Sequence, residues 1–173
     1  AMTDISASDT AELVESSVRV LPYTKSFIQG VDGDTESGIS LAKLAAAYDL
    51  FKDKDTVDIS LLLSGKADSA VANYLIDNIA ENRRDCVVFL SPSRFTSADE
   101  IVSYRNGLTS TSFAVMDSGY KYQYDRYNDV YRYIPLNGDV AGLCARTDNL
   151  RDPWFSPAGF NRGQIKNIVK LAF

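Results

Sequence analysis

The spacing of apolar residues predicts an extended segment and then a helix in the N-terminal part of the chain. Residues 17–30 alternate between apolar and polar positions, and the glycine- and acid-rich stretch 31–38 interrupts this alternation. In the segment 41–53, apolar residues recur every three or four positions and form one apolar face. That face consists of Leu41, Leu44, Tyr48 and Phe51. We assign residues 1–38 to an N-terminal extended segment and acidic loop.

Residues 39–119 have the rhythm of an α/β core. Apolar runs that predict buried strands occupy 56–65, 86–91 and 112–117. Between them, residues 70–82 have helical periodicity, and Ser97 to Glu100 form a capping box that starts a second helix ending near Gly107. Apolar strands that alternate with helices predict a parallel sheet covered on both faces.

Residues 120–173 are expected to complete the same domain. A tyrosine-rich hairpin is predicted, with a turn at 125–129, and its tyrosines are Tyr120, Tyr122, Tyr124, Tyr131 and Tyr133. Asn137 and Gly138 then turn the chain, and Asp139 caps a helix that stops before Pro153. The predicted buried stripe of this helix is Val140, Leu143, Cys144 and Leu150. A C-terminal strand follows at 163–173, which gives an α/β (α+β) fold with a mostly parallel sheet flanked by helices.

Composition narrows the possible functions. The 23 acidic and 18 basic residues give a net charge of −5, and the scattered basic residues argue against nucleic acid as a partner. No apolar run is long enough to insert into a membrane. The chain has no histidine, which excludes Ser-His-Asp and Cys-His catalysis and His-based zinc sites. Cys86 and Cys144 lack metal-site spacing and are predicted to be buried free thiols.

Several apparent chemical motifs fail on spacing. In "SGKADS", Ser60 and Ala67 stand where a phosphate-binding loop needs a glycine and a Ser or Thr. In "DGDTESG", glycine is at the seventh rather than the sixth position of a calcium loop, and Lys43 replaces the final glutamate. We therefore expect no metal, no cofactor and no enzymatic activity.

Two groups of residues leave a ligand-binding alternative open. The strand ends carry side chains able to hold an anion, although serines also commonly terminate strands. These side chains are Ser64, Lys66, Ser91, Arg94 and Asp117. The tyrosine face of the hairpin can stack sugars, although such a face more often packs on a neighbouring element. The alternative function is therefore an α/β module that binds a small anion or sugar.

The stretch "NDVYRYIPLNGDVAGLCARTDNLRDPWFSPAGFNRGQI" resembles the tail sheath proteins of contractile phages, above all those of T-even-like myoviruses. The resemblance is specific from about residue 128 to 171, whereas residues 39–117 fit that family only in rhythm. The matching residues are Pro135, Gly138, Ala141, Gly142, Ala145, Arg146, Asp148, Arg151, Trp154, Pro157, Ala158 and Gly159, and Asp139 lies among them. Sheath proteins are several hundred residues long, so we expect this chain to be a fragment.

The resemblance implies a structural subunit that forms stacked hexameric rings around a tail tube and contracts to drive the tube through the host envelope. Its implied partners are further copies of itself, the tail tube protein, and baseplate and tail terminator proteins. Its implied location is the virion tail, assembled in the host cytoplasm, with no nucleic acid bound and no membrane insertion.

Residue types suggest physical roles within the resembling block. Gly142 and Ala145 would let the helix approach the sheet closely, and Arg146 and Asp148 are candidates for ion pairs, although both side chains could instead be solvated. We expect Trp154 to pack into the core, where it would help to stiffen a loop that faces the tube or a neighbouring subunit.

Overall fold

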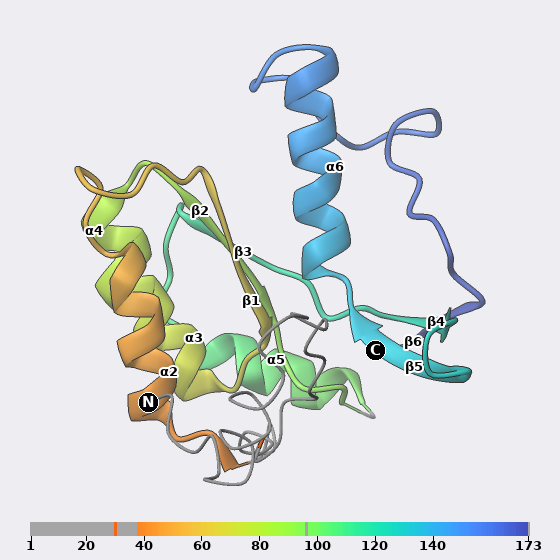
Figure 1. The fold of residues 1–173 in the computed structure, drawn as a ribbon, viewed down its shortest axis with the longest axis horizontal. Coiled ribbons are helices and arrows are strands. Elements are labelled where there is room, and N and C mark those ends of the chain that lie inside the picture. Colours follow the sequence, from red (N-terminus) through yellow and green to blue (C-terminus); the bar gives the residue numbers. More distant parts are fainter. Residues whose placement is uncertain (1–29, 31–37, 96, 173) are drawn as a thin grey trace, which may run out of the picture. The chain divides into compact units, whose positions relative to one another are not determined.

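The computed structural model describes residues 30, 38–95 and 97–172 (Figure 1). The predicted extended segment 17–30 and acidic loop 31–38 lie outside this range, apart from Gly30 and Gly38. The described helices are α2 (Leu41–Tyr48), η2 (Asp49–Phe51), α3 (Ser69–Leu75), η3 (Ile76–Ala80), α4 (Glu81–Arg83), α5 (Ala98–Asn106) and α6 (Asn137–Leu150). The described strands are β1 (Leu61–Lys66), β2 (Val87–Ser91), β3 (Ala114–Met116), β4 (Tyr120–Asp125), β5 (Val130–Pro135) and β6 (Lys170–Ala172).

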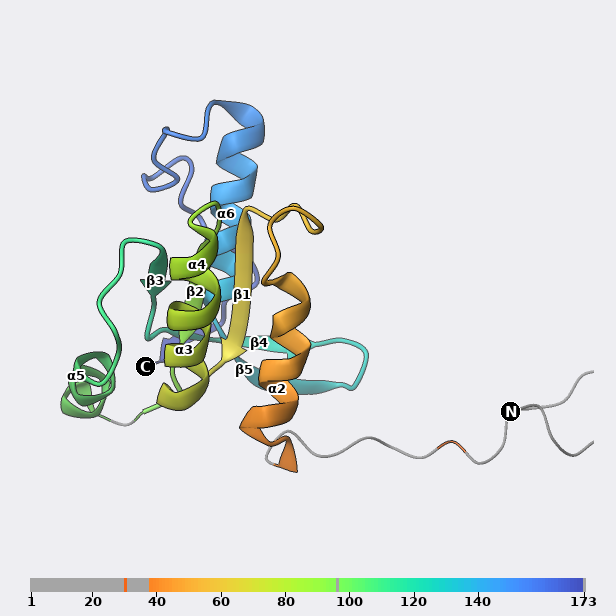
Figure 2. The ribbon, with the colours of Figure 1, turned by 90° about the vertical axis from the view of Figure 1, so that its left-hand side faces the viewer.

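The first sheet is parallel, as predicted, with the strand order β1-β2-β3. Leu62 pairs with Val88, and Phe89 pairs with Val115. Helices α3 and α4 lie on one face of this sheet and α6 lies on the other (Figure 2). Because α6 also packs on β1 and β2, the prediction of a sheet covered on both faces is confirmed.

The core lies between this sheet and the helical segment 69–83. Asp68 starts that segment, because its carboxylate accepts a hydrogen bond of 2.8 Å from the Val71 amide. Arg84 ends it in a left-handed conformation with φ of 58°. The apolar residues that it and the sheet bury together are Leu62, Val71, Leu75, Ile76, Ile79, Val88 and Leu90. The predicted stripe of Val71, Leu75 and Ile79 is therefore confirmed.

A buried arginine, which the sequence analysis missed, braces the same layer. The Arg83 side chain is fully covered and forms an ion pair of 2.8 Å with Asp85. Its guanidinium also donates to the carbonyls of Phe51, at 2.6 Å, and Val57, at 2.8 Å. These partners offset the cost of removing the charge from water. The hydrogen bond from Arg83 lowers the pKa of the Asp85 carboxyl.

Of two smaller predictions, one is confirmed in full and the other only in part. Ser97 and Glu100 form a reciprocal capping box at the start of α5, which ends at Gly107. Both cysteines are free, but only Cys86 is buried, whereas Cys144 is half-buried. Burial raises the pKa of both thiols.

The second sheet is antiparallel, with the strand order β5-β4-β6. The predicted hairpin is confirmed, with Tyr122 paired to Tyr133 and Tyr124 to Tyr131. Tyr120 is buried, and its hydroxyl donates to the Pro92 carbonyl at 2.5 Å, which ties this sheet to the end of β2. The C-terminal strand is shorter than the predicted 163–173, because pairing begins only after a left-handed residue, Asn167, with φ of 59°.

The start of α6 differs from the prediction. Asn137 and Gly138 are its first helical residues rather than a turn, and Asp139 does not cap it. The Asp139 carboxylate lies in the first turn and accepts a 2.8 Å hydrogen bond from the Lys121 ammonium group. Asn137 is buried and donates to the Gly65 carbonyl at 2.7 Å, so a side-chain amide anchors the helix to the sheet.

The buried face of α6 also differs. Its buried residues are Asn137, Ala141 and Thr147, whereas Leu150 of the predicted stripe is 67% exposed. Gly142 and Ala145 are exposed and do not mediate a close approach to the sheet. The hydrogen bonds of the Asn137 side-chain amide fix the rotation of the helix about its axis. Ala141, one turn later, supplies the small side chain that faces the sheet.

Candidate functional site

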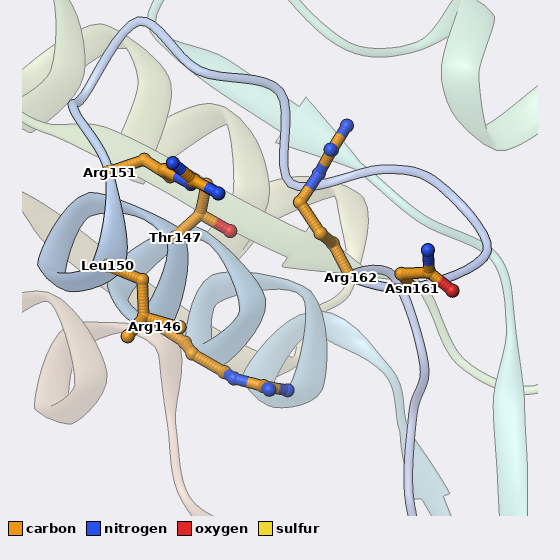
Figure 3. A pocket seen from close by; sticks show the side chains of 6 residues that line it. All are labelled: Arg146, Thr147, Leu150, Arg151, Asn161 and Arg162. Atoms are coloured by element: carbon orange, nitrogen blue, oxygen red, sulfur yellow. The ribbon is translucent and has the colours of Figure 1, made fainter.

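The last turn of α6 and the loop that follows it enclose a cavity of about 400 Å³. Figure 3 shows the residues that line it, with helical side chains on one side and loop side chains on the other. They are Arg146, Thr147, Leu150, Arg151, Asn161 and Arg162. We call this cavity the arginine pocket and the segment 151–163 the terminal loop.

Backbone geometry closes the terminal loop on itself. The Arg151 amide donates to the Thr147 carbonyl at 2.8 Å, and the Gly163 amide donates to the Gly159 carbonyl at 2.7 Å. Gly159 has φ of +127°, a conformation that other residues rarely adopt. A Cβ on Gly163 would lie 3.2 Å from the Gly159 backbone. The loop therefore favours glycine at position 159 for its backbone conformation and at position 163 for the close approach of the chain.

Phe155 organises the terminal loop, and the sequence analysis missed its role. The Arg162 guanidinium carbon lies 4.6 Å from the centre of the Phe155 ring, and that of Arg151 lies at 5.9 Å. Arg162 also donates to the carbonyls of Ser156, at 3.2 Å, and Ala158, at 3.0 Å. One half-buried ring and one arginine thus hold the loop in shape.

Trp154 does not pack into the core, so that prediction was wrong. Its side chain is 79% exposed and meets the Phe155 ring edge-on at 5.7 Å. Phe155 occupies the inward position, and its neighbour Trp154 remains at the surface. Phe160, at 98% exposed, and Leu150 add further exposed apolar side chains close by in the sequence.

The predicted ion pairs of α6 are also absent from the described part of the chain. Arg146 and Asp148 are both exposed, and neither forms a hydrogen bond or ion pair with another described residue. The solvated alternative therefore holds for both side chains. The lining of the arginine pocket contains three arginines and no carboxylate.

Other residues of the matching block serve the junction between hairpin and helix. Pro135 pairs with Tyr120 at the end of the hairpin, and Gly138 is exposed with open space around it. The Lys121 side chain is 9% exposed and is held by Asp139 of α6. The sequence carried a signal for this contact, because Lys121 alternates with the tyrosines and therefore lies on the opposite face of the hairpin.

The strand-end residues do not converge on an open anion site. The Ser91 hydroxyl donates to one Asp117 oxygen at 2.9 Å, and the other Asp117 oxygen is buried without a partner among the described residues. Burial raises the pKa of Asp117 to about 6, an effect that the Ser91 hydrogen bond opposes. Arg94 instead lies over the Tyr133 ring, at 4.0 Å. Ser64 lies beside the Asn137 amide, at 3.4 Å.

The described geometry is typical of a component of a protein assembly. A rigid core carries arginines without a carboxylate partner among the described residues, together with exposed aromatic rings, a combination typical of protein interfaces. No helix in residues 38–95 or 97–172 is long and apolar enough to cross a membrane.

Comparison with known proteins agrees with this class. Residues 41–172 match the family described as phage tail sheath protein central domain. The chain is 36% identical to the tail sheath protein of Enterobacteria phage T4 over 98% of its own length and 29% of that protein. It is 37% identical to the tail sheath protein of Vibrio phage KVP40, over 86% of this chain and 26% of that protein. A third tail sheath protein, from Salmonella phage ViI, is 38% identical over 57% of this chain and 17% of that protein.

The chain therefore belongs to the phage tail sheath protein family, whose members are structural virion proteins. This confirms the resemblance to T-even-like sheaths. The chain spans less than a third of the length of these relatives.

Proposed function

We propose that this chain is part of a sheath subunit that polymerises as stacked hexameric rings around a tail tube and contracts to drive the tube through the host envelope. The observation that carries the proposal is the match to the sheath family over residues 41–172. Its partners are further copies of the subunit, the tail tube protein, and baseplate and tail terminator proteins. The subunit is assembled in the host cytoplasm and has no catalytic role.

The braced core supports this mechanical role. A subunit that moves as a rigid body must transmit force without deforming, and close-packed interiors transmit strain well. Arg83 ties helix to loops, Asn137 ties α6 to the first sheet, and Tyr120 ties the two sheets together. Three buried polar side chains thus link the main layers, and each link is a directional hydrogen bond.

The motif residues are proposed to support assembly rather than chemistry. Gly159 and Pro157 shape the terminal loop, Asp139 fixes the hairpin to α6, and Ala141 seats α6 on the sheet. Arg146, Arg151 and the exposed Trp154 remain available for contacts with other proteins.

Electron microscopy of the full-length protein that contains this chain tests the proposal. The expected result is tubes or stacked rings, alone or on purified tail tubes, together with extended and shortened forms. A full-length Leu75→Ala variant should assemble less, because the core is weakened, whereas Val102→Ala, at a 55% exposed position, should assemble normally. A protein that stays monomeric under all these conditions would overturn the proposal.

A further inference from the structure

The arginine pocket holds cations that the described fold leaves without counter-charges. Arg151 and Thr147 project from the end of α6, and Arg162 and Asn161 belong to the loop across the gap (Figure 3). The Arg146 and Arg151 side chains donate no hydrogen bond to a described residue, whereas the Arg162 side chain uses two of its donors on loop carbonyls. Like charges gathered at one cavity repel, so a carboxylate placed there would be stabilised by charge-assisted hydrogen bonds.

Exposed apolar side chains accompany the pocket. Leu150 is 67% exposed, Trp154 79% and Phe160 98%. Water covers these side chains at a free-energy cost that burial against a partner would remove. Arginine and tryptophan are also the residue types that most often carry interface binding energy. The best occupant therefore combines carboxylates with an apolar side chain.

The chain itself carries such a segment at residues 49–58, "DLFKDKDTVD". It contains four aspartates and two lysines. Asp53, Asp55 and Asp58 are all exposed, and Leu50 is 73% exposed. The segment follows α2, which packs against α3 on the face of the parallel sheet opposite α6 (Figure 1). It therefore cannot occupy the arginine pocket of its own subunit.

We propose that the arginine pocket of one copy binds the acidic segment 49–58 of a second copy. The two surfaces differ, so the contact is heterologous, and repetition of such a contact generates rings or helical filaments rather than closed dimers. The inference rests on the proposed sheath function and adds to it the two surfaces that meet. Arg146 and Arg151 face the aspartates, and Trp154 packs beside Leu50.

Charge reversal in the full-length protein tests the contact. The Arg146→Glu/Arg151→Glu variant and the Asp53→Lys/Asp55→Lys variant should each raise the protein concentration needed for assembly by at least about tenfold. Sedimentation and electron microscopy measure that concentration. A variant with all four changes, or an equimolar mixture of the two reversed proteins, should recover assembly, because opposite charges again meet. The matched control is Arg105→Glu, which changes another exposed arginine and should assemble normally.

All the altered side chains are exposed, so the variants should fold normally. Thermal unfolding of every variant checks this and excludes misfolding as the cause of lost assembly. If the unaltered protein assembles and both reversed variants assemble equally well, the contact is overturned while the sheath function stands. Failure of the four-change variant to recover, with its unfolding temperature unchanged, also overturns the contact. If the reversed variants still assemble but no longer bind purified tube protein, the pocket contacts the tube instead, and the proposed contact between copies is overturned.

Discussion

The α/β layer and the terminal loop use the same kinds of side chain in opposite ways. Arg83 is fully covered and held by three carbonyls and a carboxylate, whereas Arg151 is exposed and its side chain lies only beside the Phe155 ring. Tyr104 is buried, with its hydroxyl on the Ala67 carbonyl at 3.0 Å, whereas Trp154 stands 79% exposed. The layer therefore provides stiffness, and the loop provides side chains that a partner can cover.

The largest expected effect belongs to the core of the layer. Leu75→Ala should lower the free energy of unfolding by about 2–5 kcal/mol, because Leu75 is fully buried and the change leaves a cavity. Urea unfolding measures the loss. The exposed Leu50→Ala control should change it by less than about 0.5 kcal/mol. Equal effects at the two leucines would refute the placement of the core.

The link between α6 and the sheet should show the next largest effect. Asn137→Ala removes the donor to the Gly65 and Phe89 carbonyls and should lower the free energy of unfolding by about 1–3 kcal/mol. Asn161→Ala, at an exposed loop position, is the matched change with little expected effect. Indistinguishable unfolding curves for Asn137→Ala and the unaltered chain would show that the amide does not anchor the helix.

Asp117 should make stability depend on pH. Its folded pKa of about 6 lies above the ordinary value of 3.8, so the protonated carboxyl favours folding below pH 4, and this contribution is lost as pH rises through 6. Asp117→Asn should be more stable than the unaltered chain at pH 7.5, by about 1 kcal/mol after allowance for solvent screening. The difference should shrink toward pH 4. Unfolding curves across this pH range measure the difference in stability. A difference that grows on acidification would contradict the raised pKa of Asp117.

The smallest effect on folding is expected at Trp154. Trp154→Ala should change the free energy of unfolding by less than about 0.5 kcal/mol, because the ring is already in water. Phe155→Ala is the contrasting change and should lower the free energy of unfolding measurably, because that ring is half-buried and lies close to two guanidinium groups. A loss of more than about 2 kcal/mol for Trp154→Ala would place the ring in the core and remove the contrast between loop and layer.

The sequence predicted most of the α/β layer because its signals are local. The capping box at Ser97, the stripe of Val71, Leu75 and Ile79, and the apolar strand runs each depend on neighbours within a few positions. The alternation of tyrosines with other residues likewise predicted the hairpin correctly. The C-terminal strand was overestimated, because apolar residues after Gly163 do not reveal where pairing with β4 begins.

The candidate site was harder to predict. The sequence identified Arg146, Arg151 and Trp154 but missed Phe155 and Arg162. The predicted orientation was wrong for Trp154, Gly142 and Ala145. A capping role for Asp139 was reasonable from its position near the helix start, yet Lys121 of the hairpin draws it into an ion pair instead. Contacts that form only in the folded chain decided each of these outcomes.

By itself, the sequence determined where most helices and strands form, that the first sheet is parallel and that the matching block is sheath-like, because these follow from periodicity and residue order. The tertiary structure decided which face of α6 meets the sheet and which of two adjacent aromatic residues turns inward. The physical reason is that the rotation of a helix and the direction of a loop ring depend on the partners that the folded chain brings next to them. For α6 these are the carbonyls of Gly65 and Phe89, and for the loop the guanidinium groups of Arg151 and Arg162.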